Sequence, residues 1–298
     1  MNSPSNNPSD CQTEMFDISD IAANQHSQPT FTRLEQALWT EQKAKLISSY
    51  LRLFVLITRH GVYIDGFAGP QYPDQPDRWA ANLVLESDPK WMRSFFLCDK
   101  NAMQARALNE LRDSQPYVRG RTINVEHEDF NLYVDRVLGT GVIGERTATF
   151  CLLDQRTFEC NWETVKKIAG HKSQMKIEIF YFVPTGWLAR SISGLRNPET
   201  IMARWWGNEN WHHLQSLSAD EIAEEFCQRF LHELGYRHAY RWPIFQEYAS
   251  KRVMYYMVHA TDHNAASGLM HRAYREVTKR PGPTDHPGAG QLSFELDK

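Results

Sequence analysis

Hydrophobic residues follow two different spacings along this chain, and the alternation between them predicts strands and helices in turn. Short unbroken apolar runs are typical of strands buried on both faces of a parallel sheet. They occur at residues 61–65, 93–98, 121–126, 147–153 and 176–183. Apolar residues at helical spacing fill the intervals, at 31–59, 79–85, 102–112, 132–138 and 162–170. Because parallel neighbours need crossover helices, this order predicts an α/β fold with a doubly wound, mostly parallel, Rossmann-like sheet.

The pattern changes after residue 184. Residues 187–240 are predicted to form a helical, aromatic-rich insertion, and residues 241–245 and 252–261 a closing β-hairpin whose last strand is internal. A final helix is expected over residues 264–278. The flanking segments are polar or rich in Pro and Gly, so we expect a flexible leader at 1–28, one α/β domain at 29–280 and a flexible tail at 281–298.

The first predicted strand ends in an acid and then breaks into a turn of small residues. This stretch reads Asp65, Gly66, Phe67, Ala68 and Gly69. Small side chains let backbone N–H groups approach a ligand closely, and ligands of open α/β sheets lie beyond the carboxyl ends of the strands. The stretch therefore predicts a site for a nucleoside-like cofactor, although a tight βα turn with no ligand has the same pattern.

A parallel sheet that ends in a β-hairpin resembles the architecture of class I S-adenosylmethionine-dependent methyltransferases, which implies S-adenosylmethionine as the cofactor. Asp99 follows the second strand, where a carboxylate can accept both ribose hydroxyls. Asp129 and Phe130 follow the third, where a carboxylate can take the exocyclic amine of adenine and a ring can pack on the base. Both aspartates are equally typical of helix N-caps, and that alternative stays open.

Asp154 ends the fourth strand, where the same resemblance places the methyl acceptor. A carboxylate at this point can orient the acceptor or take its proton, so Asp154 is the main catalytic candidate, with Glu159 as the nearby alternative. The competing interpretation is a loop aspartate that only holds a turn.

Several segments between about residues 36 and 275 also resemble one named family, the three-Cys-motif partner proteins. The most specific is Asp65-Gly66-Phe67-Ala68-Gly69-Pro70, and the others are residues 39–43, the acid-ended second and third strands, 153–154, 255–263 and Met270. The resemblance implies a class I methyltransferase-like fold and a three-cysteine, radical-type iron–sulfur protein as partner. The chain departs from the family pattern at Gln71, where a glycine is usual, and at residues 155–157, where Pro-Phe-Gly is usual.

The insertion contains a second candidate site. Arg204, Trp205, Trp206 and Trp211 mix a cation with flat aromatic rings, which is how proteins grip single-stranded nucleic acid. The alternative is a helical cap whose tryptophans pack on the sheet. A chain of this kind without catalysis would be a binding or scaffold partner of the iron–sulfur protein or of nucleic acid, which is the second functional hypothesis.

The overall charge and cysteine content narrow these possibilities. Lys and Arg number 33 against 36 Asp and Glu, a formal charge of -3, so no global basic charge attracts nucleic acid or membranes. The five cysteines form no CxxC pair and the histidines lack ligand spacing, so we expect buried thiols and no metal. No signal peptide and no run of ~18 apolar residues is present, so we expect a cytoplasmic protein with no membrane contact.

Overall fold

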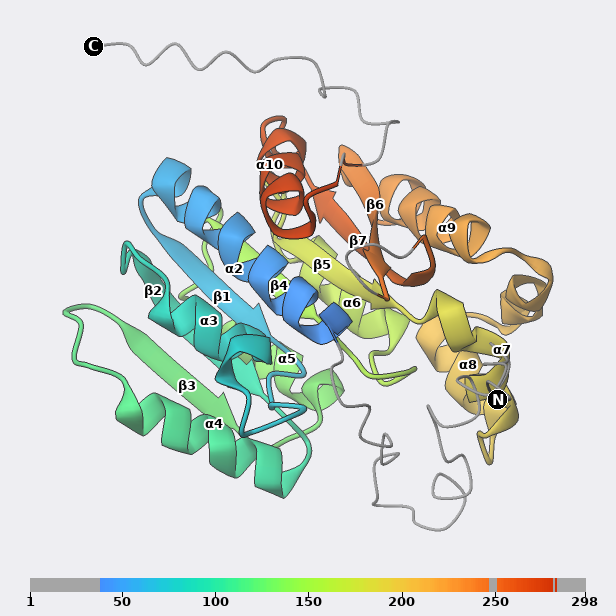
Figure 1. Ribbon diagram of the computed structural model, residues 1–298, viewed down its shortest axis with the longest axis horizontal. Helices are drawn as coiled ribbons and strands as arrows, with labels where there is room; N and C mark the ends of the chain where they lie inside the picture. The colour runs from blue at the N-terminus through green and yellow to red at the C-terminus, as the bar shows by residue number, and fades with distance from the viewer. Residues whose placement is uncertain (1–37, 247–250, 281, 283–298) are drawn as a thin grey trace, which may run out of the picture.

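The computed structural model of this protein describes residues 38–246, 251–280 and 282, and its centre is a seven-stranded sheet with the order β3-β2-β1-β4-β5-β7-β6 (Figure 1). The strands are β1 (Gly61–Asp65), β2 (Met92–Cys98), β3 (Thr122–Glu126), β4 (Thr149–Leu153), β5 (Glu178–Val183), β6 (His238–Phe245) and β7 (Val253–Thr261). The first five strands pair in parallel, whereas β7 is antiparallel to both β5 and β6. The predicted fold class and closing hairpin are therefore confirmed.

Helices cover both faces of the sheet (Figure 1). The α-helices are α2 (Leu38–Thr58), α3 (Ala80–Glu86), α4 (Ala102–Ser114), α5 (Phe130–Gly139), α6 (Trp162–Gly170), α7 (Leu188–Ser193), α8 (Pro198–Trp206), α9 (Ala219–His232) and α10 (Ala266–Thr278). One core cluster joins α2, α3, α4 and α10 to Tyr63, and the other joins α5, α6, α8 and α9 to Ile64. Tyr63 and Ile64 are neighbours in β1, so their side chains point to opposite faces, and each face has its own helical layer.

Local sequence signals explain where several helices begin and end. Asn101 caps α4 by accepting hydrogen bonds from two first-turn amides, and Ser218 and Glu221 form a capping box at the start of α9. The helix α8 ends at Gly207, whose φ is +91° and whose absent Cβ would lie 2.6 Å from the Trp162 ring. Glycine at this position therefore both ends α8 and allows it to pack closely on α6.

Several boundaries differ from the predicted ranges, and two predicted segments lie largely outside the described residues. The helix α5 begins at Phe130 rather than at residue 132, because Asp129 is its N-cap. The strand β6 begins at His238, so the helical insertion ends before that residue and not at 240. The predicted leader lies outside the described residues, as does the predicted tail except for Gly282. Among the described helices, none combines the length and the hydropathy that crossing a membrane would need.

Candidate functional site

The strand order changes direction next to β1. The chain passes from β1 to β2 and β3 on one side, and β4 and β5 lie on the other side of β1. Ligands of open α/β sheets bind beyond the carboxyl ends of the strands at such a switch point. Residues 66–70 follow β1 at this point, and the strands β2 and β4 end beside them, since the Ala68 and Gly66 amides donate to the Cys98 and Leu152 carbonyls. The topology therefore brings Asp65, Asp99 and Asp154 to one edge of the sheet, which we call the carboxyl edge.

Asp65 is the most deeply buried of these three acids, with 2% of its surface exposed. Its carboxylate accepts hydrogen bonds from the Tyr63 hydroxyl at 2.9 Å and from the Phe67 amide at 3.2 Å. Burial raises the pKa of Asp65 to about 7; the charges of Asp154 and Asp99 add to the rise, and the two hydrogen bonds oppose it. Asp154 and Asp99 are therefore close enough to influence Asp65 electrostatically.

The backbone amides of the turn after β1 all donate hydrogen bonds within the chain. Gly66 donates to the Leu152 carbonyl, Phe67 to the Asp65 carboxylate, Ala68 to the Cys98 carbonyl and Gly69 to the Asp99 carboxylate. The Trp79 indole also donates to the Ala68 carbonyl at 2.6 Å. The expectation that these amides face a ligand is therefore wrong. They tie the turn to β2 and β4, the strands on either side of it.

Asp99 holds this turn from the end of β2. Its Oδ2 accepts the Gly69 amide at 3.0 Å and its Oδ1 the Asn101 amide at 2.8 Å. A Cβ at Gly69 would lie 2.4 Å from the same Oδ2, so only glycine lets the turn approach the carboxylate. Because Asn101 caps α4, the capping alternative for Asp99 is wrong. Each carboxylate oxygen has a further lone pair, which leaves capacity for a ligand hydroxyl.

Asp129 and Phe130 lie after β3. The Oδ1 of Asp129 accepts the amide of Asn131 at 2.9 Å and its side-chain nitrogen at 2.7 Å, so the capping alternative for Asp129 is confirmed. Phe130 is 2% exposed; its ring would be 2.5 Å from a Cβ at Gly66 and contacts the Phe67 ring edge-on at 6.1 Å. Phe130 therefore supports the turn from the core. Contact of Asp129 with an adenine stays a prediction.

Asp154, after β4, pairs with Lys43 of α2. The Lys43 Nζ lies 2.8 Å from Oδ1 and 2.6 Å from Oδ2, and the two side chains are 13% and 16% exposed. The helix leads into β1 through residues 59 and 60 only, so it runs antiparallel to the strands and its first turns lie at the carboxyl edge. Lys43 is not among the predicted site residues. The direction of its helix is the signal that could have revealed it.

A buried glutamine fixes the loop that carries Asp154. Gln155 is 0% exposed; its side-chain nitrogen donates to the Phe182 carbonyl at 3.3 Å and its oxygen accepts the Cys160 amide at 2.6 Å. It occupies the position where the family resemblance has proline. In this chain the loop is therefore held to the end of β5 by side-chain hydrogen bonds instead of by a rigid proline turn.

Glu159, the other catalytic candidate, is paired with Lys100. The Lys100 Nζ lies 2.8 Å from one carboxylate oxygen, and the Arg156 amide donates to the other at 2.9 Å. Burial by itself raises the pKa of Glu159, but the Lys100 charge and these hydrogen bonds outweigh it and hold that pKa below its ordinary value. Glu159 is therefore a charged, fully partnered carboxylate.

The tryptophans of the insertion lie in the core. Trp205, Trp206 and Trp211 are 0%, 4% and 2% exposed, whereas Arg204 is exposed. A buried indole cannot stack on a base, so the predicted nucleic-acid grip through these tryptophans is wrong, and the core alternative is confirmed. The Trp205 ring contacts the Phe158 ring edge-on at 4.9 Å. The insertion thus packs behind the loop that carries Asp154.

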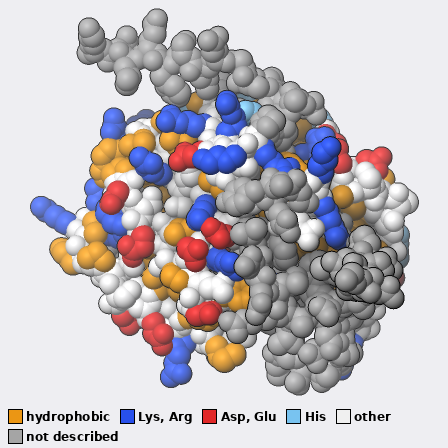
Figure 2. Space-filling view, viewed as in Figure 1, with side chains coloured by type: hydrophobic (Ala, Val, Ile, Leu, Met, Phe, Trp, Pro, Cys, Tyr) orange, Lys and Arg blue, Asp and Glu red, His pale blue; other side chains and the backbone are white. Residues whose placement is uncertain are grey.

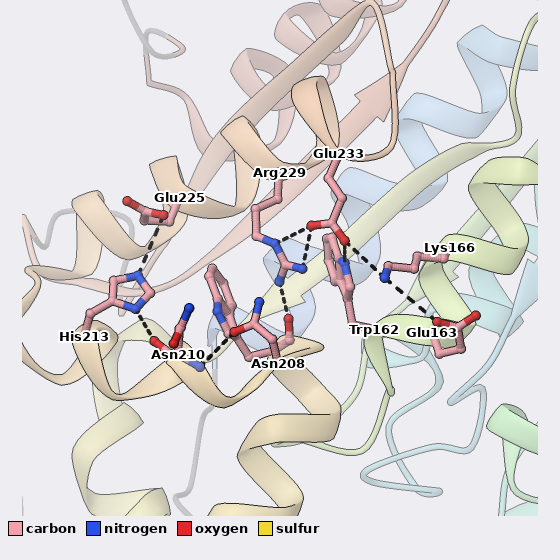
Figure 3. Close-up of polar contacts among 10 residues, drawn as sticks. Trp162, Glu163, Lys166, Asn208, Asn210, His213, Glu225, Arg229 and Glu233 are labelled. Atoms are coloured by element: carbon pink, nitrogen blue, oxygen red, sulfur yellow. Dashed lines mark hydrogen bonds and ion pairs between the residues drawn. The ribbon is translucent and has the colours of Figure 1, made fainter.

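An arginine of α9 joins the insertion to α6 (Figure 3). The Arg229 guanidinium lies between the Trp162 and Trp206 rings, 3.9 Å and 4.2 Å from their centres. It donates to the Trp206 carbonyl and, at 2.6 Å, to the Glu233 carboxylate, which also accepts the Trp162 indole at 2.8 Å. In the insertion, the cation that contacts the aromatic rings is therefore Arg229, and the contact lies in the interior of the protein. Residues from three helices make the contact, so no local pattern indicates it.

Other features of the described surface do not compete with the carboxyl edge. Acidic and basic side chains are interspersed on the face shown in Figure 2. Within the described ranges, no group of three His, Cys, Asp or Glu side chains could hold a metal ion. A cavity of about 580 Å³ lies at the opposite edge of the sheet, where Thr149 and Glu178 begin β4 and β5. It is separate from the acids discussed above.

At the carboxyl edge, side-chain oxygens rather than backbone amides are available to a polar ligand. Asp99 retains acceptor capacity, and beside it the Gln104 side-chain oxygen is buried without a hydrogen-bond partner. Leaving a buried acceptor unpaired costs about 1–3 kcal/mol, which a polar ligand group would offset. The turn amides are already used. A ligand here would therefore be held by carboxylate and amide oxygens.

Comparisons with known proteins add little to this description. No known family model matches the sequence, and no curated protein matches it. Among solved structures, the chain is similar to the protein LPL1258 from Legionella pneumophila, described under the family model DUF519. The similarity covers 82% of this chain and 94% of that one, with 10% sequence identity and a TM-score of 0.42. At this level of similarity no activity can be transferred.

Proposed function

We propose that this protein binds S-adenosylmethionine at the carboxyl edge and is a methyltransferase-like protein. Asp99 would accept hydrogen bonds from the ribose hydroxyls. The Asp129 carboxylate would accept a hydrogen bond from the adenine amine. The cofactor, when bound, supplies an electrophilic methyl group on a sulfonium. Asp154 would lie near the acceptor and orient it or accept its proton.

The observation that carries this proposal is the grouping of three carboxylates at the switch point. Asp65, Asp99 and Asp154 come from β1, β2 and β4, and both neighbours contribute to the raised pKa of Asp65. The surrounding sheet is parallel and closes with an antiparallel hairpin, as the resemblance to class I methyltransferases implies. The Asp99 and Asp154 carboxylates accept hydrogen bonds, which matches a ligand with hydroxyl and amine donors.

A second function, a non-catalytic binding or scaffold partner, is favoured by a different observation. Both catalytic candidates are neutralised within the chain, Asp154 by Lys43 and Glu159 by Lys100. A carboxylate held in an ion pair is a weaker general base than a free one. The partner would be a three-cysteine iron–sulfur protein or a nucleic acid, and the buried tryptophans would not form the contact.

Calorimetric titration tests the cofactor site. We expect saturable binding of S-adenosylmethionine and of its demethylated product to the wild-type protein. Asp99→Ala should weaken binding by ~1.5–3 kcal/mol, the range for a hydrogen bond to a charged group. Asp113→Ala, an exposed change at the other end of α4, is the matched control and should leave the affinity unchanged.

Two outcomes of this titration separate the hypotheses. If folded wild-type protein binds neither compound, the methyltransferase-like proposal is overturned and the scaffold function is favoured. If both compounds bind but Asp99→Ala binds equally well, the cofactor lies elsewhere than the carboxyl edge. Circular dichroism of each variant establishes that a lost affinity does not reflect unfolding.

A further inference from the structure

We propose that the methyl acceptor of this site is an aliphatic amine, and that Lys43 of the same chain occupies the acceptor position. The inference rests on the proposed function, because it names the acceptor class for the same carboxyl edge. Its basis is the surroundings of one atom, the Lys43 Nζ. We call Asp154, Phe182 and Tyr255, which surround that nitrogen, the amine box.

The amine box is assembled from segments far apart in the sequence. The Lys43 Nζ lies within 2.8 Å of both carboxylate oxygens of Asp154 and 5.9 Å and 5.7 Å from the ring centres of Phe182 and Tyr255. These residues come from the loop after β4, from β5 and from β7. The ammonium is thus held by one negative charge and two aromatic rings, which is the chemistry that binds alkylammonium groups.

The two rings of the amine box are held in place by their neighbours. Phe182 and Tyr255 are 4% and 1% exposed, and their centres are 4.9 Å apart. Trp187 packs on both, at 6.0 Å from Phe182 and 5.9 Å from Tyr255. Gln155 bonds the Phe182 carbonyl and so fixes β5 relative to the loop of Asp154. An ordinary surface ion pair requires no such preformed aromatic setting.

The chemistry of the amine box favours an amine over a nucleobase. A protonated alkylamine gains from the Asp154 charge and from both rings, whereas the amino group of a base carries no charge to be attracted. Methylation leaves an alkylammonium charged, so the box can hold both the acceptor and its product. The position of Asp154 at the end of β4 is the one at which the donor methyl and the acceptor are expected to meet.

Transfer of the methyl group to Lys43 requires no reactant other than S-adenosylmethionine. The Lys43 ammonium gives one proton to Asp154, which is 16% exposed and passes it to solvent. The freed nitrogen lone pair then forms a bond to the methyl carbon. The bond between that carbon and the sulfonium sulfur breaks, and its electron pair stays on sulfur. The products are N-methylated Lys43, the neutral thioether and one released proton.

The first test is peptide mass spectrometry of the purified full chain after incubation with S-adenosylmethionine. We expect one or more methyl groups on Lys43 and none on Lys45, which is two residues away, 44% exposed and paired with Glu41. Lys45 is therefore an internal control for nonspecific chemical methylation, because it is the more accessible amine. Methyl groups on both lysines in equal amount would overturn the inference.

The second test does not depend on the cofactor. Lys43→Ala removes the side chain and leaves the amine box open, so n-butylamine should raise the melting temperature of this variant in a saturable way. Neutral 1-butanol has the same chain length and should bind at least ~10-fold more weakly, because it lacks the charge that Asp154 and the rings attract. Lys43→Met fills the space without a charge, and this variant should not respond to n-butylamine.

The outcomes distinguish failure of this inference from failure of the proposed function. Saturable cofactor binding without methylation of Lys43, and without an amine effect on Lys43→Ala, overturns the amine acceptor and leaves the cofactor site standing. Stabilisation by n-butylamine without any cofactor binding overturns the proposed function and the transfer to Lys43. If Lys43→Ala does not fold, methylation of wild-type Lys43 against Lys45 still decides the question.

Discussion

The sequence predicts a binding site both at the carboxyl edge and in the aromatic insertion, but the side chains of the two regions have different roles in the folded protein. At the carboxyl edge, the Asp154 side chain is 16% exposed and pairs with Lys43, and Asp99, although only 6% exposed, is held by the Gly69 amide. In the insertion, Trp205 and Trp211 are removed from solvent almost completely. The first region keeps groups that can bind a polar ligand, and the second contributes to the core.

The difference follows from what each side chain loses or gains on burial. A carboxylate in an apolar interior loses hydration at a large free-energy cost, so it stays near an edge or acquires partners such as Lys43 and Lys100. Moving an indole out of water into the core lowers the free energy of the protein. The Arg229 guanidinium enters the core because two rings and Glu233 replace its hydration. A mixture of cations and aromatics in a sequence therefore indicates an interior cluster as readily as a binding surface.

The largest expected effect belongs to the insertion. Trp205→Ala should lower the free energy of unfolding by ~3–5 kcal/mol, the usual cost of removing a large buried aromatic side chain. Urea denaturation measures the change. Arg204→Ala, the adjacent exposed residue, is the control and should stay within ~0.5 kcal/mol of wild type. An unchanged midpoint for Trp205→Ala would mean that this tryptophan does not lie in the core.

The next effect concerns the buried acid of the carboxyl edge. The folded-state pKa of Asp65, about 7, is above its unfolded value, so the folded protein binds this proton more tightly and stability falls as pH rises from about 4 to about 7. Asp65→Asn removes this titrating carboxyl and therefore its contribution to the pH dependence of stability. The stability of wild type relative to Asp65→Asn should therefore fall by ~2–3 kcal/mol between about pH 5 and pH 8.

Urea denaturation at several pH values measures this difference. Replacing an exposed aspartate, Asp135→Asn, controls for the loss of one acid and should not reproduce the same slope. A wild-type protein whose stability tracks that of Asp65→Asn at every pH would show that Asp65 does not hold its proton near neutrality.

The remaining effect is on catalysis and decides whether the carboxyl edge is active. Asp154→Asn keeps the size of the side chain and removes its charge, so methyl transfer should drop ~10²-fold, the usual contribution of a positioned base, while cofactor affinity is preserved. Radiolabel transfer and calorimetry measure the two quantities. Glu159→Gln is the comparison, and we expect a smaller drop because Lys100 already holds that carboxylate. Equal rates for Asp154→Asn and wild type would remove Asp154 from the chemistry.

The sequence by itself determined the elements and their order. Unbroken apolar runs predicted the five parallel strands, and the change of pattern after residue 184 predicted the insertion and the hairpin, including the internal position of β7. The acids after β1, β2 and β4 also had to share one edge, because the carboxyl ends of parallel strands do. These features follow from the spacing of apolar residues and from the order of strands and helices, which the local sequence encodes directly.

Only the tertiary structure decided which side chains meet. Lys43 and Asp154 are separated by 111 positions, and Trp162 and Glu233 by 71. The Gly69 amide is held by Asp99, 30 residues away, and is thereby unavailable to a ligand. A periodic pattern states which face of an element is apolar, but not which residue of another element lies opposite. Those pairings depend on how helices such as α2 and α8 pack on the sheet. This packing is a property of the core as a whole.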